Sequence, residues 1–171
     1  NFYEDVLGWY RSSVNAGPMS GRWWSTDEGE HSEYTAVYVR GASTLHMLRV
    51  MLGEEAFWTA IRMYVADNAH TLVETDDLRA AFETVTGQHL GWFFDQWTHL
   101  PGAPEVTASH RYEDGFLRVD VSQKGDRIFS FPLDLEVGTA DGIVTHREWI
   151  DEGSLRFSIP LENSPTYVAV D

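Results

Sequence analysis

Along the first hundred residues, apolar side chains recur at steps of three and four, the spacing that places them on one face of a helix. The first such repeat predicts a helix from Tyr34 to Leu52 and consists of Val37, Tyr38, Ala42, Leu45, Leu48 and Leu52. A second repeat predicts a helix over Glu54–Ala69 that buries Phe57, Ile61, Tyr64 and Val65. Each of these helices therefore has one face available for a core.

Glycines and acidic residues mark where the predicted helices begin and end. Gly53 and Gly87 are placed as left-handed stops, which glycine adopts without steric cost. Thr75 is predicted to be the N-cap of a third helix, and Asp76 and Asp77 favour the positive end of its dipole. Two more helices are expected over Phe2–Ser13 and Leu90–Thr98, and the segment Gly17–Glu30 has no period and is expected to be a loop.

After Pro104 the pattern changes to alternation of apolar and polar residues, which is typical of half-buried strands. The alternating apolar residues are Phe116, Val119 and Val121, then Ile128 to Val137, then Leu155, Phe157 and Ile159, then Tyr167, Val168 and Val170. Turn signals separate them at Glu113-Asp114-Gly115, Lys124-Gly125-Asp126, Ala140-Asp141-Gly142 and Asn163-Ser164-Pro165. We therefore expect an α+β protein, in which an α-helical subdomain (residues 1–103) is followed by a small antiparallel β-sandwich (residues 104–171).

Composition narrows the possible partners. The 171 residues are 43% hydrophobic with a formal net charge of −15, which argues for a globular chain and against binding nucleic acid or anionic lipid. There is no cysteine, which rules out disulfides and thiolate metal sites and leaves the compartment open. No apolar run approaches the roughly 20 residues that a spanning helix needs, so no membrane span is expected in this chain.

The residues alone reveal no active site. The seven histidines stand nowhere three to five residues apart, so a His-x-x-x-His zinc pair is absent. Asp76 and Asp77 are interpreted as helix caps, because adjacent helical side chains point about 100° apart. Trp23 and Trp24 are interpreted as packing residues, with a sugar-stacking platform as the alternative. No Gly-x-Ser-x-Gly elbow or phosphate-binding glycine loop is present.

One stretch nevertheless matches a known pattern in order and spacing. The matching residues are Tyr38-Val39-Arg40-Gly41-Ala42, Leu52-Gly53, Thr75-Asp76-Asp77-Leu78, Phe93-Phe94-Asp95-Gln96-Trp97 and Gly102-Ala103-Pro104. This pattern resembles the aminopeptidase N family of gluzincin-type zinc peptidases. The resemblance runs from about Tyr34 to Pro104, and a weaker one, which includes Gln123 and the strand at Phe131-Pro132-Leu133, extends to the end of the chain.

The resemblance implies a catalytic role for Tyr38. In the family this tyrosine donates a hydrogen bond to the oxyanion that forms on the scissile carbonyl, and a phenol suits that role because it keeps its proton at neutral pH. Arg40 stands where the family more often has lysine, and its role is left open.

The family's zinc motif, His-Glu-x-x-His with a later glutamate, does not occur in these residues. The segment Trp23–Gly29 is only superficially like the environment of the third zinc ligand. The resemblance therefore implies no cofactor in this chain, with zinc, the general-base glutamate and the peptide's amino-terminal contacts supplied by an upstream catalytic subdomain of a longer parent. We expect this C-terminal fragment to be inactive by itself.

Two other functions stay open at this point. A non-catalytic relative would keep the fold as a scaffold that binds another protein, and loss of the zinc ligands from the full-length parent would favour it. A carbohydrate-binding module would use the tryptophan-rich segment, and titration with sugars followed by tryptophan fluorescence would test it.

Overall fold

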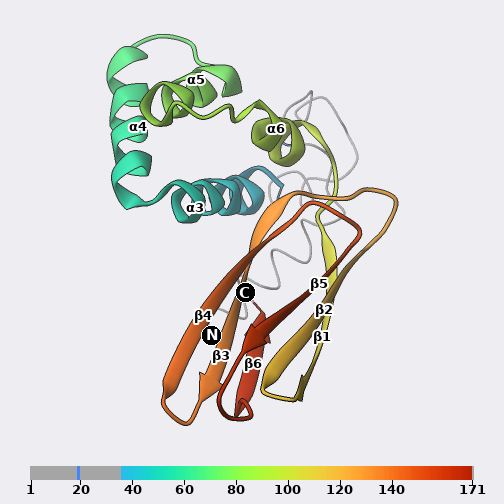
Figure 1. The fold of residues 1–171 in the computed structure, drawn as a ribbon. Coiled ribbons are helices and arrows are strands. Elements are labelled where there is room, and N and C mark those ends of the chain that lie inside the picture. The colour runs from blue at the N-terminus through green and yellow to red at the C-terminus, as the bar shows by residue number, and fades with distance from the viewer. Residues whose placement is uncertain (1–18, 20–35, 171) are drawn as a thin grey trace. The chain divides into compact units, whose positions relative to one another are not determined.

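The computed structural model describes Met19 and residues 36–170, and the chain divides into two compact units, Asn1–Ala103 and Pro104–Asp171. Helices make up the described part of the first unit and strands make up the second (Figure 1). The α+β class predicted from periodicity is confirmed. The predicted helix Phe2–Ser13, the pair Trp23–Trp24 and all of the predicted loop except Met19 lie outside the described residues.

The described part of the first unit consists of short helices that follow one another along the chain (Figure 1). In order they are a π-helical turn η2 (Ala36–Arg40), α3 (Gly41–Leu52), α4 (Glu54–Asp67), α5 (Thr75–Thr86), α6 (Gly91–Phe94) and a second π-helical turn η3 (Asp95–His99). The predicted single helix from Tyr34 is thus a π turn followed by an α-helix over its described residues, and the predicted Leu90–Thr98 helix is likewise divided.

The core of this unit forms mainly where α4 packs against α5. Phe57 of α4 and Phe82 of α5 are both buried, with ring centroids 5.6 Å apart. The prediction that Val65 is buried is wrong, because its side chain is 62% exposed. The buried stripe of α4 runs through Phe57 and the fully buried Ala60, and Val65 points away from it, since successive helical residues turn by about 100°.

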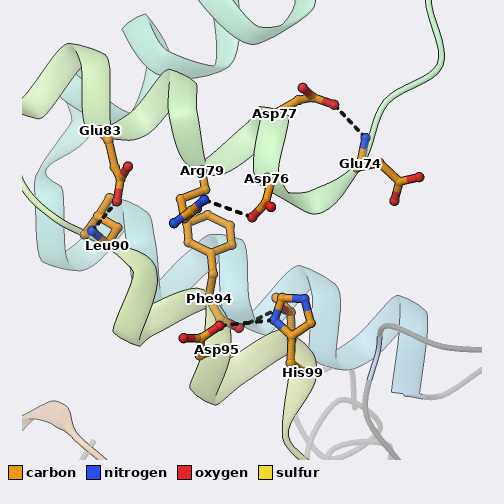
Figure 2. Close-up of polar contacts among 10 residues, drawn as sticks. Glu74, Asp76, Asp77, Arg79, Glu83, Leu90, Phe94, Asp95 and His99 are labelled. Atoms are coloured by element: carbon orange, nitrogen blue, oxygen red, sulfur yellow. Dashed lines mark hydrogen bonds and ion pairs between the residues drawn. The ribbon is translucent and has the colours of Figure 1, made fainter.

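Polar contacts set the ends of α5 (Figure 2). The prediction of Thr75 as N-cap is wrong by one residue: Glu74 is the N-cap, and its backbone N–H donates to Asp77 Oδ2 at 2.7 Å. At the other end Gly87 has φ +67°, as its place after the helix predicts. Seven residues beyond Glu83, the backbone N–H of Leu90 donates to Glu83 Oε1 at 2.7 Å, which links α5 to the start of α6.

The second unit contains two three-stranded antiparallel sheets. Their strand orders are β1-β2-β5 and β4-β3-β6, with β1 (Glu105–Glu113), β2 (Phe116–Lys124), β3 (Phe131–Thr139), β4 (Gly142–Ile150), β5 (Ser154–Pro160) and β6 (Tyr167–Val170). Strands β2 and β3 are central and bury alternate residues, including the predicted Val119 and Val121 on β2 and Leu133 and Leu135 on β3. The prediction is wrong for Phe116, which is 44% exposed, because its neighbour Leu117 takes the buried face.

Strands β1 and β4 were not predicted, although the turns Glu113-Asp114-Gly115 and Ala140-Asp141-Gly142 lie where the sequence places them. Both strands are at sheet edges, and nearly all of their side chains are exposed or half-buried. An edge strand without a buried face has no need for alternating apolar residues, so the period-2 signal is missing.

Gln123 fastens two loops of the sandwich to the end of β2. Its side chain is buried, Nε2 donates to the carbonyl oxygens of Phe129 at 2.8 Å and Glu152 at 3.2 Å, and Oε1 accepts from the Phe129 N–H at 3.0 Å. Burying a side-chain amide costs free energy when its polar atoms lack partners, and these hydrogen bonds remove that cost. Gln123 therefore has a structural role in this unit.

Candidate functional site

Tyr38 lies in the middle of the π turn η2, directly before α3. A π turn fits one more residue into the turn than an α-helix does; such turns are rare and frequently occur at functional sites. Its side chain is 61% exposed, although helical periodicity alone groups it with core residues. The backbone of this tyrosine is thus irregular, and its phenol is accessible.

The buried residues of this segment lie on a different stripe from Tyr38. Arg40, Thr44 and Leu48 follow one another at four-residue steps and are all buried. Tyr38 and Leu45, which the sequence assigned to the same apolar face as Leu48, are exposed. The structure therefore turns an apolar stripe, and with it Tyr38, away from the core.

That exposed stripe borders a hollow of about 500 Å³ within the first unit. Val37, Tyr38, Leu45 and Leu48 contribute from η2 and α3, and further lining residues include Tyr64, Val73, Leu78, Phe94 and Thr98. Most of these side chains are apolar, and among the described residues that line the hollow Glu74 is the one with a carboxylate. The arrangement suits a ligand that presents an apolar group beside a polar one.

Arg40 ends the π turn that carries Tyr38, and its guanidinium reaches the far end of the same unit. The side chain is 5% exposed; Nε donates to the Trp97 carbonyl at 3.0 Å and Nη2 donates to the Leu100 carbonyl at 2.6 Å. These carbonyls lie at the C-terminal end of η3, where helical carbonyls lack partners within the helix and the dipole is negative. The backbone carbonyl of Arg40 in turn accepts from Thr44 Oγ1 at 2.8 Å.

The acidic pair at Asp76 and Asp77 has the capping role predicted for it (Figure 2). Asp77 accepts the Glu74 N–H, and Asp76 pairs with Arg79 at 3.2 Å. On η3, Asp95 Oδ1 lies 3.6 Å from His99 Nδ1. Among the residues that the structure describes, no three His, Asp or Glu side chains are placed together to hold a metal ion. The donors present in this part of the chain do not fit a zinc site.

Sequence reasoning identified Tyr38 but missed the contacts of Arg40 and most of the hollow. The partners of Arg40 stand 57 and 60 residues further along the chain, so no local pattern indicates them. Val73 precedes α5 and had no functional signal of its own, and Leu78 had only its place in the family pattern. Helical spacing places Arg40 between the apolar positions, so its burial had no local signal either.

The segment that contains Tyr38 and Arg40 matches a known domain. Residues 22–97 match the Peptidase family M1 domain. This segment is therefore similar to part of that domain. The resemblance predicted from the Tyr-x-Arg-Gly-Ala and Gln-Trp elements is therefore confirmed.

Relatives of this M1 segment are several times longer than the chain. It is 34% identical over 86 residues to aminopeptidase M1 of Arabidopsis thaliana, covering 50% of this chain and 10% of that protein. It is 35% identical over 72 residues to aminopeptidase N of Lactococcus lactis subsp. lactis, covering 42% of the chain and 8% of that protein. The chain thus spans about a tenth of the length of the curated relatives it matches.

The fold of the M1 segment and the sandwich is also found in a solved structure. Legionella pneumophila aminopeptidase A, crystallised in complex with aspartic acid, matches 93% of this chain and 19% of its own with a TM-score of 0.73 and 17% sequence identity. At that identity the match shows the fold. Across the described residues of the chain, no helix is both long and apolar enough to cross a membrane.

Proposed function

We propose that this chain is part of a zinc-dependent aminopeptidase that hydrolyses N-terminal residues from peptides, and that Tyr38 is its transition-state hydrogen-bond donor. The observation that carries the proposal is the placement of Tyr38: an accessible phenol on a π turn, at the border of an apolar hollow, within the segment that matches the M1 domain. The names of the relatives support the reaction class.

The proposed reaction requires Tyr38 to donate a hydrogen bond to the substrate. When water attacks the scissile carbonyl, its oxygen becomes negatively charged, and a neutral phenol can donate a hydrogen bond to it without giving up the proton. Because Tyr38 belongs to a turn fastened at its end by Arg40, its backbone is set before substrate binds. Pre-set donors of this kind stabilise a transition state more than solvent water does, since they need no reorganisation.

The remaining machinery belongs outside this chain. The sequence lacks the family's zinc motif, and the described side chains do not form a metal site. We propose that an upstream catalytic subdomain binds the zinc, which polarises the substrate carbonyl and activates water when bound, and supplies the general base. Residues 1–103 are then the C-terminal subdomain of the catalytic domain, residues 104–171 are the β-sandwich that follows it, and the isolated chain is inactive.

The test of Tyr38 uses the full-length protein in which we propose that this chain occurs. Tyr38→Phe should lower kcat on an aminoacyl-nitroanilide by about 10²- to 10³-fold, the usual cost of removing one oxyanion donor. Tyr112→Phe is the matched control: it also removes one phenol, whose oxygen donates to the Leu161 carbonyl at 3.1 Å in the sandwich, and should leave turnover unchanged. Wild-type turnover by Tyr38→Phe would refute the assignment.

A second experiment uses the isolated 171-residue chain and tests whether the zinc site lies outside it. Metal analysis after dialysis against zinc should find much less than one zinc per chain, and the nitroanilide should not be hydrolysed. Stoichiometric zinc, or hydrolysis that a chelator abolishes, would show that this chain holds a metal site of its own and would overturn that part of the proposal.

A further inference from the structure

Arg40 is the ionisable side chain with the least solvent exposure in the part of the chain that the structure describes. A cation withdrawn from water is costly unless it is well hydrogen-bonded. Here the guanidinium of Arg40 donates to two backbone carbonyls, those of Trp97 at 3.0 Å and Leu100 at 2.6 Å. A guanidinium suits two acceptors side by side because its donors are fixed in one plane.

The two ends that Arg40 joins are both π turns. Tyr38 and Arg40 belong to η2, and the accepting carbonyls lie in and just after η3, where the Leu100 N–H also donates to the Asp95 carbonyl at 3.1 Å. On the η3 side, Thr98 Oγ1 also donates to the Phe94 carbonyl at 2.6 Å. The junction between η2 and η3 is thus held by the guanidinium of Arg40 and by a hydroxyl that bonds the backbone beside it. The contact therefore fixes one irregular turn against another.

Tyr38 depends on this junction for its position. Its side chain is 61% exposed, and the direction in which it leaves the chain is set by the backbone of a five-residue turn. Arg40 is two residues away in that turn and fixes its C-terminal end. A catalytic group displaced by about 1 Å can lose about a hundredfold in rate.

We infer that Arg40 is a positioning residue for Tyr38. By bonding η2 to the carbonyls of Trp97 and Leu100, Arg40 holds the phenol of Tyr38 in place. The inference rests on the proposed role of Tyr38 in peptide hydrolysis. It gives a physical function to a residue type that the family resemblance left unexplained.

The experiment measures kcat and KM of the full-length protein on the same nitroanilide. Arg40→Met removes both hydrogen bonds and should lower kcat by about a hundredfold while KM changes by less than about threefold. Arg40→Lys keeps the charge but not the fork, and should recover turnover to within about tenfold of wild type. Arg49→Met is the matched control, because Arg49 lies on α3 with its side chain 43% exposed and bonds Glu54 on the surface; it should turn over at the wild-type rate.

A double-mutant cycle separates positioning from general support of the fold. In the Tyr38→Phe background the donor is already gone, so Arg40→Met should slow turnover by less than about twofold. The same loss in both backgrounds would overturn the inference and leave the role of Tyr38 intact. Wild-type turnover by Tyr38→Phe alone would refute the proposed function, and the inference with it.

Folding is checked by circular dichroism and thermal unfolding of each variant. If Arg40→Met does not fold, the cycle is run with Arg40→Lys, which retains a donor and the charge. Wild-type turnover by a folded Arg40→Met variant overturns the inference.

Discussion

The packing of Tyr167 on Gly138 gives the sharpest test of the sandwich. The two residues are cross-strand partners on β6 and β3, and Tyr167 Oη donates to Glu136 Oε1 at 2.5 Å. A methyl group at position 138 would overlap two ring carbons of Tyr167 and lie 2.8 Å from Thr166 Oγ1. The glycine is therefore required by the space that the ring occupies. We predict that Gly138→Ala destabilises the second unit.

The magnitude follows from two opposing terms. Forcing a methyl group into a filled site costs about 1–3 kcal/mol. Replacing glycine by alanine in a strand returns about 0.5–1 kcal/mol, because glycine loses more conformational freedom on folding. The two terms leave a net loss of about 0–2.5 kcal/mol, centred near 1 kcal/mol, and each kcal/mol lowers the melting temperature by about 4–8 °C for a unit of this size.

Differential scanning calorimetry of the chain measures this loss, with Gly153→Ala as the control. A methyl at Gly153 would meet Ile128 Cδ1 at 3.4 Å, an ordinary contact, so that variant should stay within about 0.5 kcal/mol of wild type. In a Tyr167→Ala background, Gly138→Ala should cost less than about 0.5 kcal/mol. An equal cost with and without the Tyr167 ring would refute the reasoning.

A second readout follows the phenol itself. The hydrogen bond to Glu136 raises the pKa of Tyr167 above its ordinary value of 10.0, because the ionised phenolate would lose that bond and face the carboxylate. If the alanine methyl displaces the ring, the pKa of Tyr167 should fall back toward 10.0. NMR titration of the ring resonances would show this, and an unchanged pKa would mean that the ring had not moved.

Three further outcomes are expected. Gln123→Leu should destabilise the sandwich by about 2–4 kcal/mol, because buried backbone groups lose their amide partner; unchanged calorimetric stability would contradict this. Glu83→Ala should speed hydrogen exchange at the Leu90 amide and cost about 1 kcal/mol, whereas equal exchange would exclude the bond in solution. The hydrogen bond from Arg147 holds the pKa of Asp134 below 3.8, so the stability it gives is present above that pH and lost as the pH falls through the lowered pKa; an acid titration of Asp134→Asn should lack this loss.

Elements with a buried face could be predicted from the sequence. The alternation along β2 and β3 and the helix from Thr75 to Gly87 are found where their apolar periods and stop signals place them. Edge strands with few buried side chains were predicted unevenly, because β1 and β4 were missed whereas β6 was found. Val65 illustrates the limit within a helix, because an apolar residue next to the stripe looks the same in sequence as one in it.

The candidate site divides in a similar way. Tyr38 could be named because the family pattern is local, a run of five residues that crosses from η2 into α3. Its exposure and the π turn could not be foreseen, since helical spacing groups it with the core. The bonds of Arg40 depend on residues near position 100, and only the folded chain brings those carbonyls within reach.

The apolar border of the hollow also affects self-association of the chain in solution. The exposed side chains of Leu45 and Val73 favour hydrophobic association between molecules, while the net charge of −15 opposes it by electrostatic repulsion. Salt shortens the reach of that repulsion from about 10 Å at 0.1 M to about 3 Å at 1 M. Clustering of the isolated chain should therefore grow with ionic strength, so a dilute buffer is the better medium for every measurement on it.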